Sequence, residues 1–179
     1  MNMYRAYTYC NNLTEAKCGN SVENFAQAYA VCKKLTQPVC GPKVTNMWAT
    51  YENCTGLRGA AVCGDNVIDM ASAYRYCTGL TEAVCGPNVT NMSGAYYGCN
   101  GIAEAVCGEN VIDMSGAFYN CRKITKPVCG NKVESMSGTY FNTSVTYAVC
   151  GENVVDFDTA YALTYIKYPV VGPNVVSMY

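Results

Sequence analysis

Apolar residues recur along the chain with a period of 22 residues, and polar residues fill the positions between them. The recurring unit reads M-x-x-A-[YF]-x-x-C-x-x-[LI]-x-x-[AP]-V-C-G-x-x-V-x-x. The apolar residues of M-x-x-A-Y-x-x-C lie three and four apart, which predicts a short helix or turn, whereas x-A-V-C-G is a short apolar run that predicts a strand. The units begin at Met3, Phe25, Met47, Met70, Met92, Met114, Met136 and Phe157, and a ninth begins at Met178.

Neither piece of this unit would be stable alone, because each has only one face to bury. Stacking identical units buries the same face of every copy and pairs the strands of consecutive units. We therefore expect residues 1–179 to form a single repeat domain, an α/β solenoid of eight units. It would have one parallel sheet with short helices or turns on the opposite side. At about 4.8 Å per unit, the solenoid would be roughly 38 Å long.

The runs VTNMSGAYYGC and LTEAVCGPNV resemble the BspA-like leucine-rich repeat, in the short Met-containing form found in bacterial surface lipoproteins and in some phage tail or virion proteins. The resemblance covers essentially the whole chain. It implies a leucine-rich-repeat solenoid in which Leu80, Ala83 and Cys85 point inward and Val84 points out from the sheet. The sequence departs from the family pattern at the strand, where Ala or Pro and then Cys replace the usual aliphatic residues, and at Thr143 and Thr164, which replace the first Cys of their units.

The outward position of the strand is apolar in nearly every unit, with Lys17 as the exception. A continuous apolar stripe of this kind exceeds what scattered surface residues explain, so we expect it to contact a partner. A register shifted by one residue would instead bury these valines and expose the Ala and Cys positions, and the sequence leaves this alternative open. The predicted sheet-face contact residues are Val39, Val62, Val84, Val106, Val128, Val149 and Val170.

The cysteines form two columns of the repeat. Disulfides between neighbouring units are sterically feasible, because adjacent units bring equivalent Cα atoms to about 4.8 Å. The odd total of 13, the aliphatic Val171 in the second column and the lack of a secretory signal favour buried free thiols instead. The columns are Cys10, Cys32, Cys54, Cys77, Cys99 and Cys121, and Cys18, Cys40, Cys63, Cys85, Cys107, Cys129 and Cys150.

The residue types argue against an active site or a metal centre. The chain contains no His and no closely spaced Cys pair, which disfavours both a zinc site and an activated thiolate. Carboxylates such as Glu82, Glu104 and Asp113 recur in step with the repeat, which is typical of solvated structural positions. We therefore expect a non-enzymatic protein without a cofactor. A formal charge of −1 and the absence of a basic run disfavour nucleic acid as a partner.

Two further columns have structural interpretations. The aromatic column, which runs from Tyr7 to Tyr161, is expected in the core with its hydroxyls reaching the rim. The glycine that follows each strand, for example Gly86, is expected to adopt an unusual backbone angle at a turn. The N-terminus lacks the apolar stretch of a secretory signal, and no window has about 20 consecutive apolar residues.

Neither end of the chain has a polar terminal unit, although solenoids normally need one. This pattern predicts head-to-tail stacking of copies, or docking to other structural proteins, in a fibre, virion or surface assembly. The alternative is an adhesin or recognition module that binds a host-surface receptor on the Val-lined face. We expect no membrane insertion, and localisation to a virion or extracellular surface after synthesis in the cytoplasm. The predicted end-to-end contact residues are Met3, Tyr4, Tyr7, Val175, Met178 and Tyr179.

Overall fold

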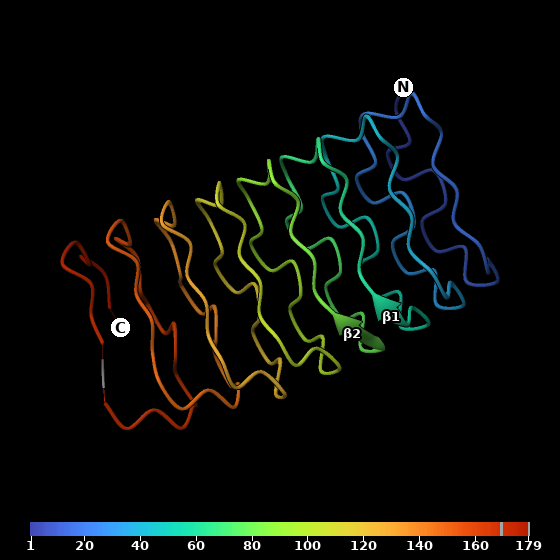
Figure 1. Cartoon of the computed structure of the whole chain (residues 1–179). Helices are drawn as coiled ribbons and strands as arrows, with labels where there is room; N and C mark the ends of the chain where they lie inside the picture. Colours follow the sequence, from blue (N-terminus) through green and yellow to red (C-terminus); the bar gives the residue numbers. More distant parts are fainter. Residues whose placement is uncertain (169, 179) are drawn as a thin grey trace.

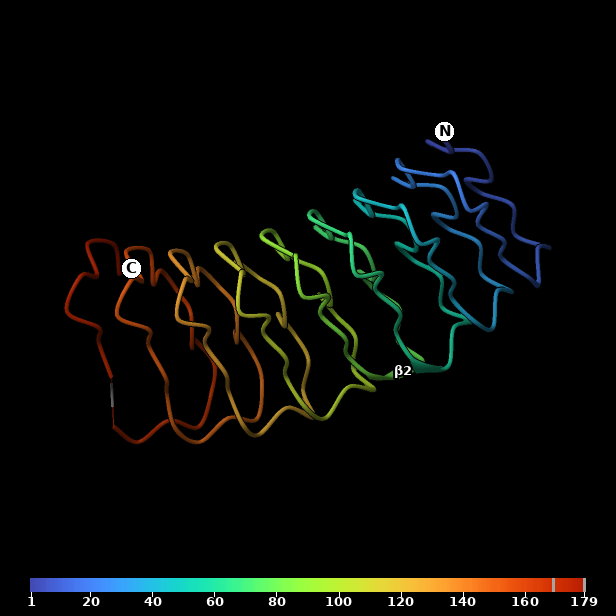
Figure 2. The same cartoon turned by 45° about the horizontal axis from the view of Figure 1, so that its top comes forward.

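The chain is a coil of stacked turns, with the two termini at opposite ends (Figure 1). This computed structural model describes residues 1–168 and 170–178. Seen from a second direction, the same turns stack side by side along a gently bent axis (Figure 2). The predicted repeat solenoid with parallel pairing is therefore present. Tyr179, one of the predicted contact residues, lies outside the described residues.

Regular secondary structure is sparse, and the expected short helices do not form within 1–168 and 170–178. Two strands, β1 (Gly59–Ala60) and β2 (Leu80–Glu82), pair in parallel. β1 lies in the unit that begins at Met47, which has 23 residues, and β2 lies in the following unit. Gly59 in β1 has a φ of 75°. Of the two alternatives that the sequence left open, a short helix or a turn, the structure has the turn, because spacings of three and four also fit a series of tight turns.

The turn segment satisfies its backbone in two alternating ways. Gly94 donates its N–H to the carbonyl of Ser115 in the next repeat (2.8 Å), whereas the neighbouring Ala95 donates back to Met92 (3.0 Å). Gly94 and Gly98 have φ values of 60° and 73°, which glycine adopts without steric cost. Bonds along the stack and bonds within each turn thus replace a helix.

The parallel ladder that runs along the whole stack lies just before the Met or Phe of each repeat. Met92 donates its N–H to the carbonyl of Asp113 at 2.9 Å, and Thr90 donates to Ile68 at 2.9 Å. The Asn or Asp side chain at this position also accepts the N–H two residues later, as Asn91 does from Ser93. The acids of this column therefore have a structural role. Parallel bridges connect Asn2, Asn24, Asn46, Asp69, Asn91, Asp113, Ser135, Asp156 and Ser177 in succession.

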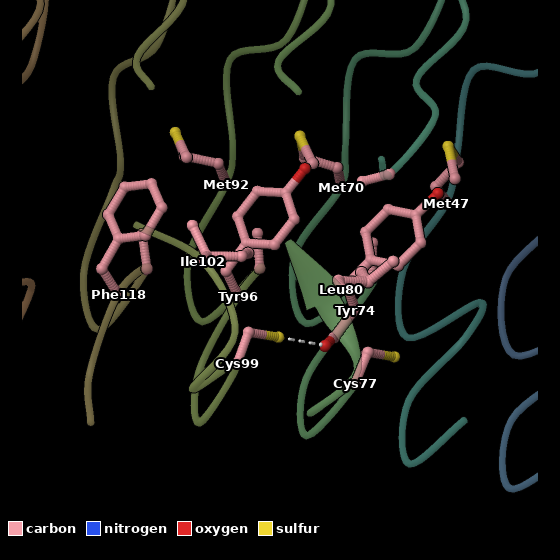
Figure 3. Close-up of a cluster of buried hydrophobic side chains, with 14 of the residues drawn as sticks. Met47, Met70, Tyr74, Cys77, Leu80, Met92, Tyr96, Cys99, Ile102 and Phe118 are labelled. Carbon is pink, nitrogen blue, oxygen red and sulfur yellow. Dashed lines mark hydrogen bonds between the residues drawn. The ribbon is translucent and has the colours of Figure 1, made fainter. Parts of the chain in front are cut away.

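The core consists of the Met, aromatic, Cys and Leu or Ile positions of successive repeats (Figure 3). Met92, Tyr96, Cys99 and Ile102, which come from one repeat, are each fully buried. Consecutive rings of the aromatic column stack with centroids 5.2 to 5.8 Å apart. The expected core position is confirmed from Tyr29 to Tyr140, whereas Tyr7 in the first repeat is exposed. Each repeat therefore buries its apolar face only against its neighbours.

The hydroxyls of the aromatic column lie inside the coil, not at its rim as expected. The Tyr51 hydroxyl accepts the N–H of Val39 (2.9 Å) and donates to the carbonyl of the same residue (2.7 Å). Because these backbone groups bond to an interior side chain, the A-V-C-G segment does not form the predicted strand ladder. The same pair of hydrogen bonds joins Tyr29 to Lys17, Tyr74 to Val62, Tyr96 to Val84, Tyr140 to Val128 and Tyr161 to Val149.

All thirteen cysteines are free thiols. In the first column the thiol donates to a carbonyl of the preceding repeat, as Cys99 does to Tyr74 at 3.0 Å (Figure 3). In the second column each half-buried sulfur lies under the glycine of the next repeat. A Cβ at Gly86 would lie 2.9 Å from Cys63 Sγ. Close approach, and not a positive φ as expected, therefore explains this glycine column.

Candidate functional site

The predicted Val stripe is only partly accessible. The six valines from Val39 to Val149 are half-buried, and Val39, Val84 and Val106 pack against the core. Val170, which lies in the last repeat, is 43% exposed. The segment that carries these residues is irregular, so they line a surface without the sheet that was expected beneath them. Their role as contact residues stays a prediction.

The predicted end-to-end residues differ in accessibility. Met3 and Val175 pack against the core, whereas Tyr4, Tyr7 and Met178 are exposed. Met178 also lines an apolar pocket in the last repeats. The other residues of this pocket are Ala148, Phe157, Tyr161, Leu163, Thr164, Ile166, Val170 and Val171.

A second aromatic stack, which sequence reasoning missed, lies on the outside of the coil. We call Arg75, Tyr97, Tyr119 and Phe141 the outer aromatic ladder; each directly follows the buried aromatic of its repeat and is half-buried. The ring centroids are 4.5 Å apart from Tyr97 to Tyr119 and 4.3 Å apart from Tyr119 to Phe141, with interplanar angles of 5° and 7°. The Arg75 guanidinium lies 4.8 Å from the Tyr97 ring centroid. Four consecutive repeats thus contribute to one continuous stack.

Tyr76 completes this surface from the side. Its ring lies 5.0 Å from the Arg75 guanidinium and meets the Tyr97 ring edge to face at 5.3 Å. Gly98 makes room for Tyr76, because a Cβ at Gly98 would lie 2.6 Å from a carbon of the Tyr76 ring. The guanidinium therefore contacts two aromatic rings at once.

The Arg75 guanidinium has unused hydrogen-bonding capacity. Its Nε is buried and has no acceptor. Within the described ranges, no carboxylate forms an ion pair with Arg75. A ligand cannot reach this closed atom, but it can reach the terminal N–H groups of the half-buried side chain.

Small residues flank the outer aromatic ladder. Ser93-Gly94, Ser115-Gly116 and Ser137-Gly138 follow the Met of three successive repeats. A Cβ at Gly138 would lie 3.5 Å from the Tyr119 ring, and one at Gly116 would have no neighbour within 4 Å. A partner can therefore approach the backbone beside the rings at Gly116, whereas Gly138 is buried.

The consensus hides the outer aromatic ladder, because its position reads Thr, Ala, Glu, Arg, Tyr, Tyr, Phe and Ala in successive repeats. The signal that could have found it is the spacing of Tyr97, Tyr119 and Phe141 at 22 residues. Local aromatic enrichment matters here more than recurrence in every repeat.

Metal ligands, thiol pKa values and membrane-spanning helices each bear on what the described residues can do. No group of three or more Cys, Asp or Glu side chains that could hold a metal ion occurs in residues 1–168 and 170–178. Burial raises the pKa of Cys54 and Cys121 to about 12, which keeps these thiols protonated. The same described part of the chain has no helix long and apolar enough to cross a membrane.

Among solved structures, the chain is similar to the crystal structure of a leucine-rich repeat protein from T. pallidum, with a TM-score of 0.60 and 20% sequence identity. The match covers 70% of this chain and 60% of the other, so the chain spans less than two thirds of that protein's length. The similarity supports a repeat solenoid of the leucine-rich-repeat type. No protein-family model and no curated protein sequence matches the chain.

Proposed function

We propose that this chain is a non-enzymatic protein-interaction solenoid that docks a partner protein on the outer aromatic ladder. The observation that carries this proposal is the surface cluster of one Arg and four aromatic side chains. Arg and Tyr are enriched among the residues that dominate binding energy at protein interfaces. The leucine-rich-repeat fold suits this function, because stacked repeats create an extended surface from few residue types.

Preorganisation favours this surface over the other candidates. The rings of Tyr97, Tyr119 and Phe141 are already stacked, so a partner orders few rotamers on binding. The Val stripe contributes smaller side chains that are half-buried. The open position at Gly116 lets a partner's backbone approach closely, which extends the contact beyond the rings.

Site-specific photo-crosslinking tests this proposal. A photoreactive residue at Tyr119 should capture a partner in cells of the source organism, and the partner is then purified. Its affinity is measured for the original chain and for Tyr97→Ser with Tyr119→Ser. We expect a loss of about 2 kcal/mol or more, as for interface hot spots. Tyr147→Ser, at an exposed tyrosine in a later repeat, is the matched control. Equal affinity for all three proteins would refute the proposal.

Head-to-tail stacking is a second candidate, favoured by the backbone hydrogen bonds between successive repeats. Successive repeats pair in the same way throughout, as Tyr96 and Gly98 donate their N–H groups to the carbonyls of Ala117 and Tyr119 at 2.9 and 2.7 Å. A second copy that presents the same groups would continue this stack in register and build a fibre.

Sedimentation velocity over a concentration series tests stacking. Stacked copies would give species that lengthen with concentration, and Tyr7→Asp should stop this growth because it places a charge beside the Tyr29 ring. A single small species at all concentrations would exclude stacking and leave the lateral docking proposal unaffected.

We further propose that the chain belongs to the BspA-like leucine-rich repeat proteins. It would then lie on a virion or bacterial surface, as an assembly component or an adhesin. The repeat motif supports it, in particular LTEAVCGPNV followed by MSGAYYGC. Immunogold labelling of the source material with an antibody to the chain tests this placement. Label confined to the cell interior would contradict it.

A further inference from the structure

We propose that the partner segment recognised at the outer aromatic ladder is acidic, with a carboxylate bound to Arg75. This inference rests on the proposed function and adds the chemistry of the partner. It depends on how the neighbours of Arg75 hold its guanidinium and on which of its surfaces they leave available.

Two neighbouring rings hold the guanidinium in place. Tyr76 and Tyr97 lie 5.0 and 4.8 Å from it, which is the range of cation–π contacts. Neither ring accepts a conventional hydrogen bond from the guanidinium, so its outer N–H donors stay available. A carboxylate matches these donors with two parallel hydrogen bonds.

The chain itself does not supply that carboxylate. Arg75 forms no ion pair within residues 1–168 and 170–178, and its buried Nε lacks an acceptor. Glu52 occupies the equivalent position one repeat earlier, yet it does not pair with Arg75. Nε itself is closed to solvent, so a ligand carboxylate would bond the terminal N–H groups of this half-buried side chain, where a charge-assisted hydrogen bond is stronger than a neutral one.

The rest of the ladder also favours negative charge. An aromatic ring has a negative face and a positive edge. Because Tyr97, Tyr119 and Phe141 stack face to face, they turn edges, not faces, to the outside. Acidic or carbonyl groups of an extended segment would therefore meet partial positive charge along the ladder, while its apolar side chains cover the rings.

Nucleic acid fits this surface less well. Phosphate backbones are bound by several Lys and Arg side chains in a row. The ladder has a single Arg, and the chain carries a formal charge of −1. One well-placed carboxylate beside apolar contacts is the better match.

The test compares two peptides that differ in charge alone. One alternates Glu and Leu, and the other alternates Gln and Leu. Calorimetry measures the affinity of each peptide for the full chain. We expect the Glu peptide to bind about tenfold more tightly, as a charge-assisted hydrogen bond predicts. Arg75→Gln should remove that difference.

Matched variants keep the test decisive. Arg122 is exposed on another part of the repeat, so Arg122→Gln changes the net charge equally and should preserve the tenfold difference. Arg75→Lys should retain part of the preference, because the charge stays while the planar fork is lost. Thermal melts of each variant establish that it is folded.

Equal binding of the two peptides would overturn the acidic preference, and so would a difference that survives Arg75→Gln. The proposed function would stand in either case if the affinity of the crosslinked partner still falls when Tyr97 and Tyr119 are replaced. If neither the peptide preference nor that loss of affinity is observed, the outer aromatic ladder is not a docking surface.

Discussion

At the scale of single residues, the interior tyrosine hydroxyl replaces the strand hydrogen bonds that the A-V-C-G segment lacks. One hydroxyl satisfies both the N–H and the carbonyl of one Val, as Tyr96 does for Val84. Phe118 is the exception in this column. Without a hydroxyl there, Val106 has no protein partner for either group within the described residues.

Phe118→Tyr should therefore stabilise the protein. The new hydroxyl would supply the two missing hydrogen bonds to Val106, for a gain of about 1 kcal/mol in the free energy of unfolding. The reverse change at the neighbouring repeat, Tyr96→Phe, should cost about 1 to 3 kcal/mol, because it leaves buried backbone groups unpaired. Urea unfolding of both variants measures these differences. A destabilising Phe118→Tyr would contradict the role given to the hydroxyls.

The glycine after each A-V-C run makes room for the preceding repeat. A Cβ at Gly86 would lie 2.9 Å from both Cys63 Sγ and the Gly64 carbonyl oxygen. Gly86→Ala should therefore cost about 1 to 3 kcal/mol through overpacking. Gly19→Ala is the control, because its Cβ would meet only Val22 at 3.7 Å. Equal melting temperatures for the two variants would show that close approach is not the constraint.

At the scale of the repeat, the turn segment depends on left-handed backbone positions. The third residue of each unit has φ near 50° to 60°, and it is Ser72 in one repeat and Gly116 in another. A non-glycine residue pays a steric cost there. The M-S-G-A form of the later repeats is thus better suited to the turn than the earlier M-A-S-A form.

Exchanging these residues should move stability in opposite directions. Ser72→Gly should raise the free energy of unfolding, and Gly116→Ala should lower it, each by roughly 1 kcal/mol. Chemical denaturation followed by far-ultraviolet circular dichroism measures both changes. If Gly116→Ala left the unfolding midpoint unchanged, the left-handed turns would contribute nothing to stability.

The sequence predicted the repeat solenoid and the main core columns, because apolar residues that recur at Met92, Tyr96 and Ile102 are those that the stack buries. It did not predict where the stack pairs. The Asn or Asp before each Met looked like a solvated position, yet Asn91 and its equivalents carry the parallel ladder. The spacing placed Tyr96 in the core, but it did not reveal that the Tyr96 hydroxyl would form hydrogen bonds with the backbone of Val84.

The sequence pattern did not predict the outer aromatic ladder, for a different reason. A consensus keeps what all repeats share, whereas Arg75, Tyr97 and Phe141 distinguish their repeats from the others. Sequence periodicity therefore predicts the scaffold better than the surface. Function in a repeat protein depends on such departures, since only they make one part of the rod different from the next.

At the scale of the whole molecule, buried thiols and phenols make stability depend on alkaline pH. Burial raises the pKa of Cys54 and Cys121 from 9.0 to about 12, and that of Tyr74 and Tyr96 well above 10. The folded state therefore holds protons that the unfolded chain releases at lower pH. This contribution is intact below about pH 9 and is lost as the pH rises toward 12.

Unfolding in urea at pH 7 and at pH 10.5, with reductant present, should thus show a lower midpoint at the higher pH. Each such thiol contributes a slope of about 1.4 kcal/mol per pH unit between its unfolded and folded pKa values. Cys121→Val removes one titrating group and should reduce the slope. Equal midpoints at the two pH values would contradict the burial of these groups.

We propose that a partner docks on the side of the rod and not on its ends. Hydroxyl-radical footprinting of the chain, alone and with the purified partner, distinguishes these two sites. We predict that binding protects Tyr97, Tyr119 and Phe141 from oxidation and leaves the exposed terminal tyrosines Tyr9 and Tyr165 unchanged. Protection of the terminal tyrosines, with the ladder oxidised as before, would contradict the claim.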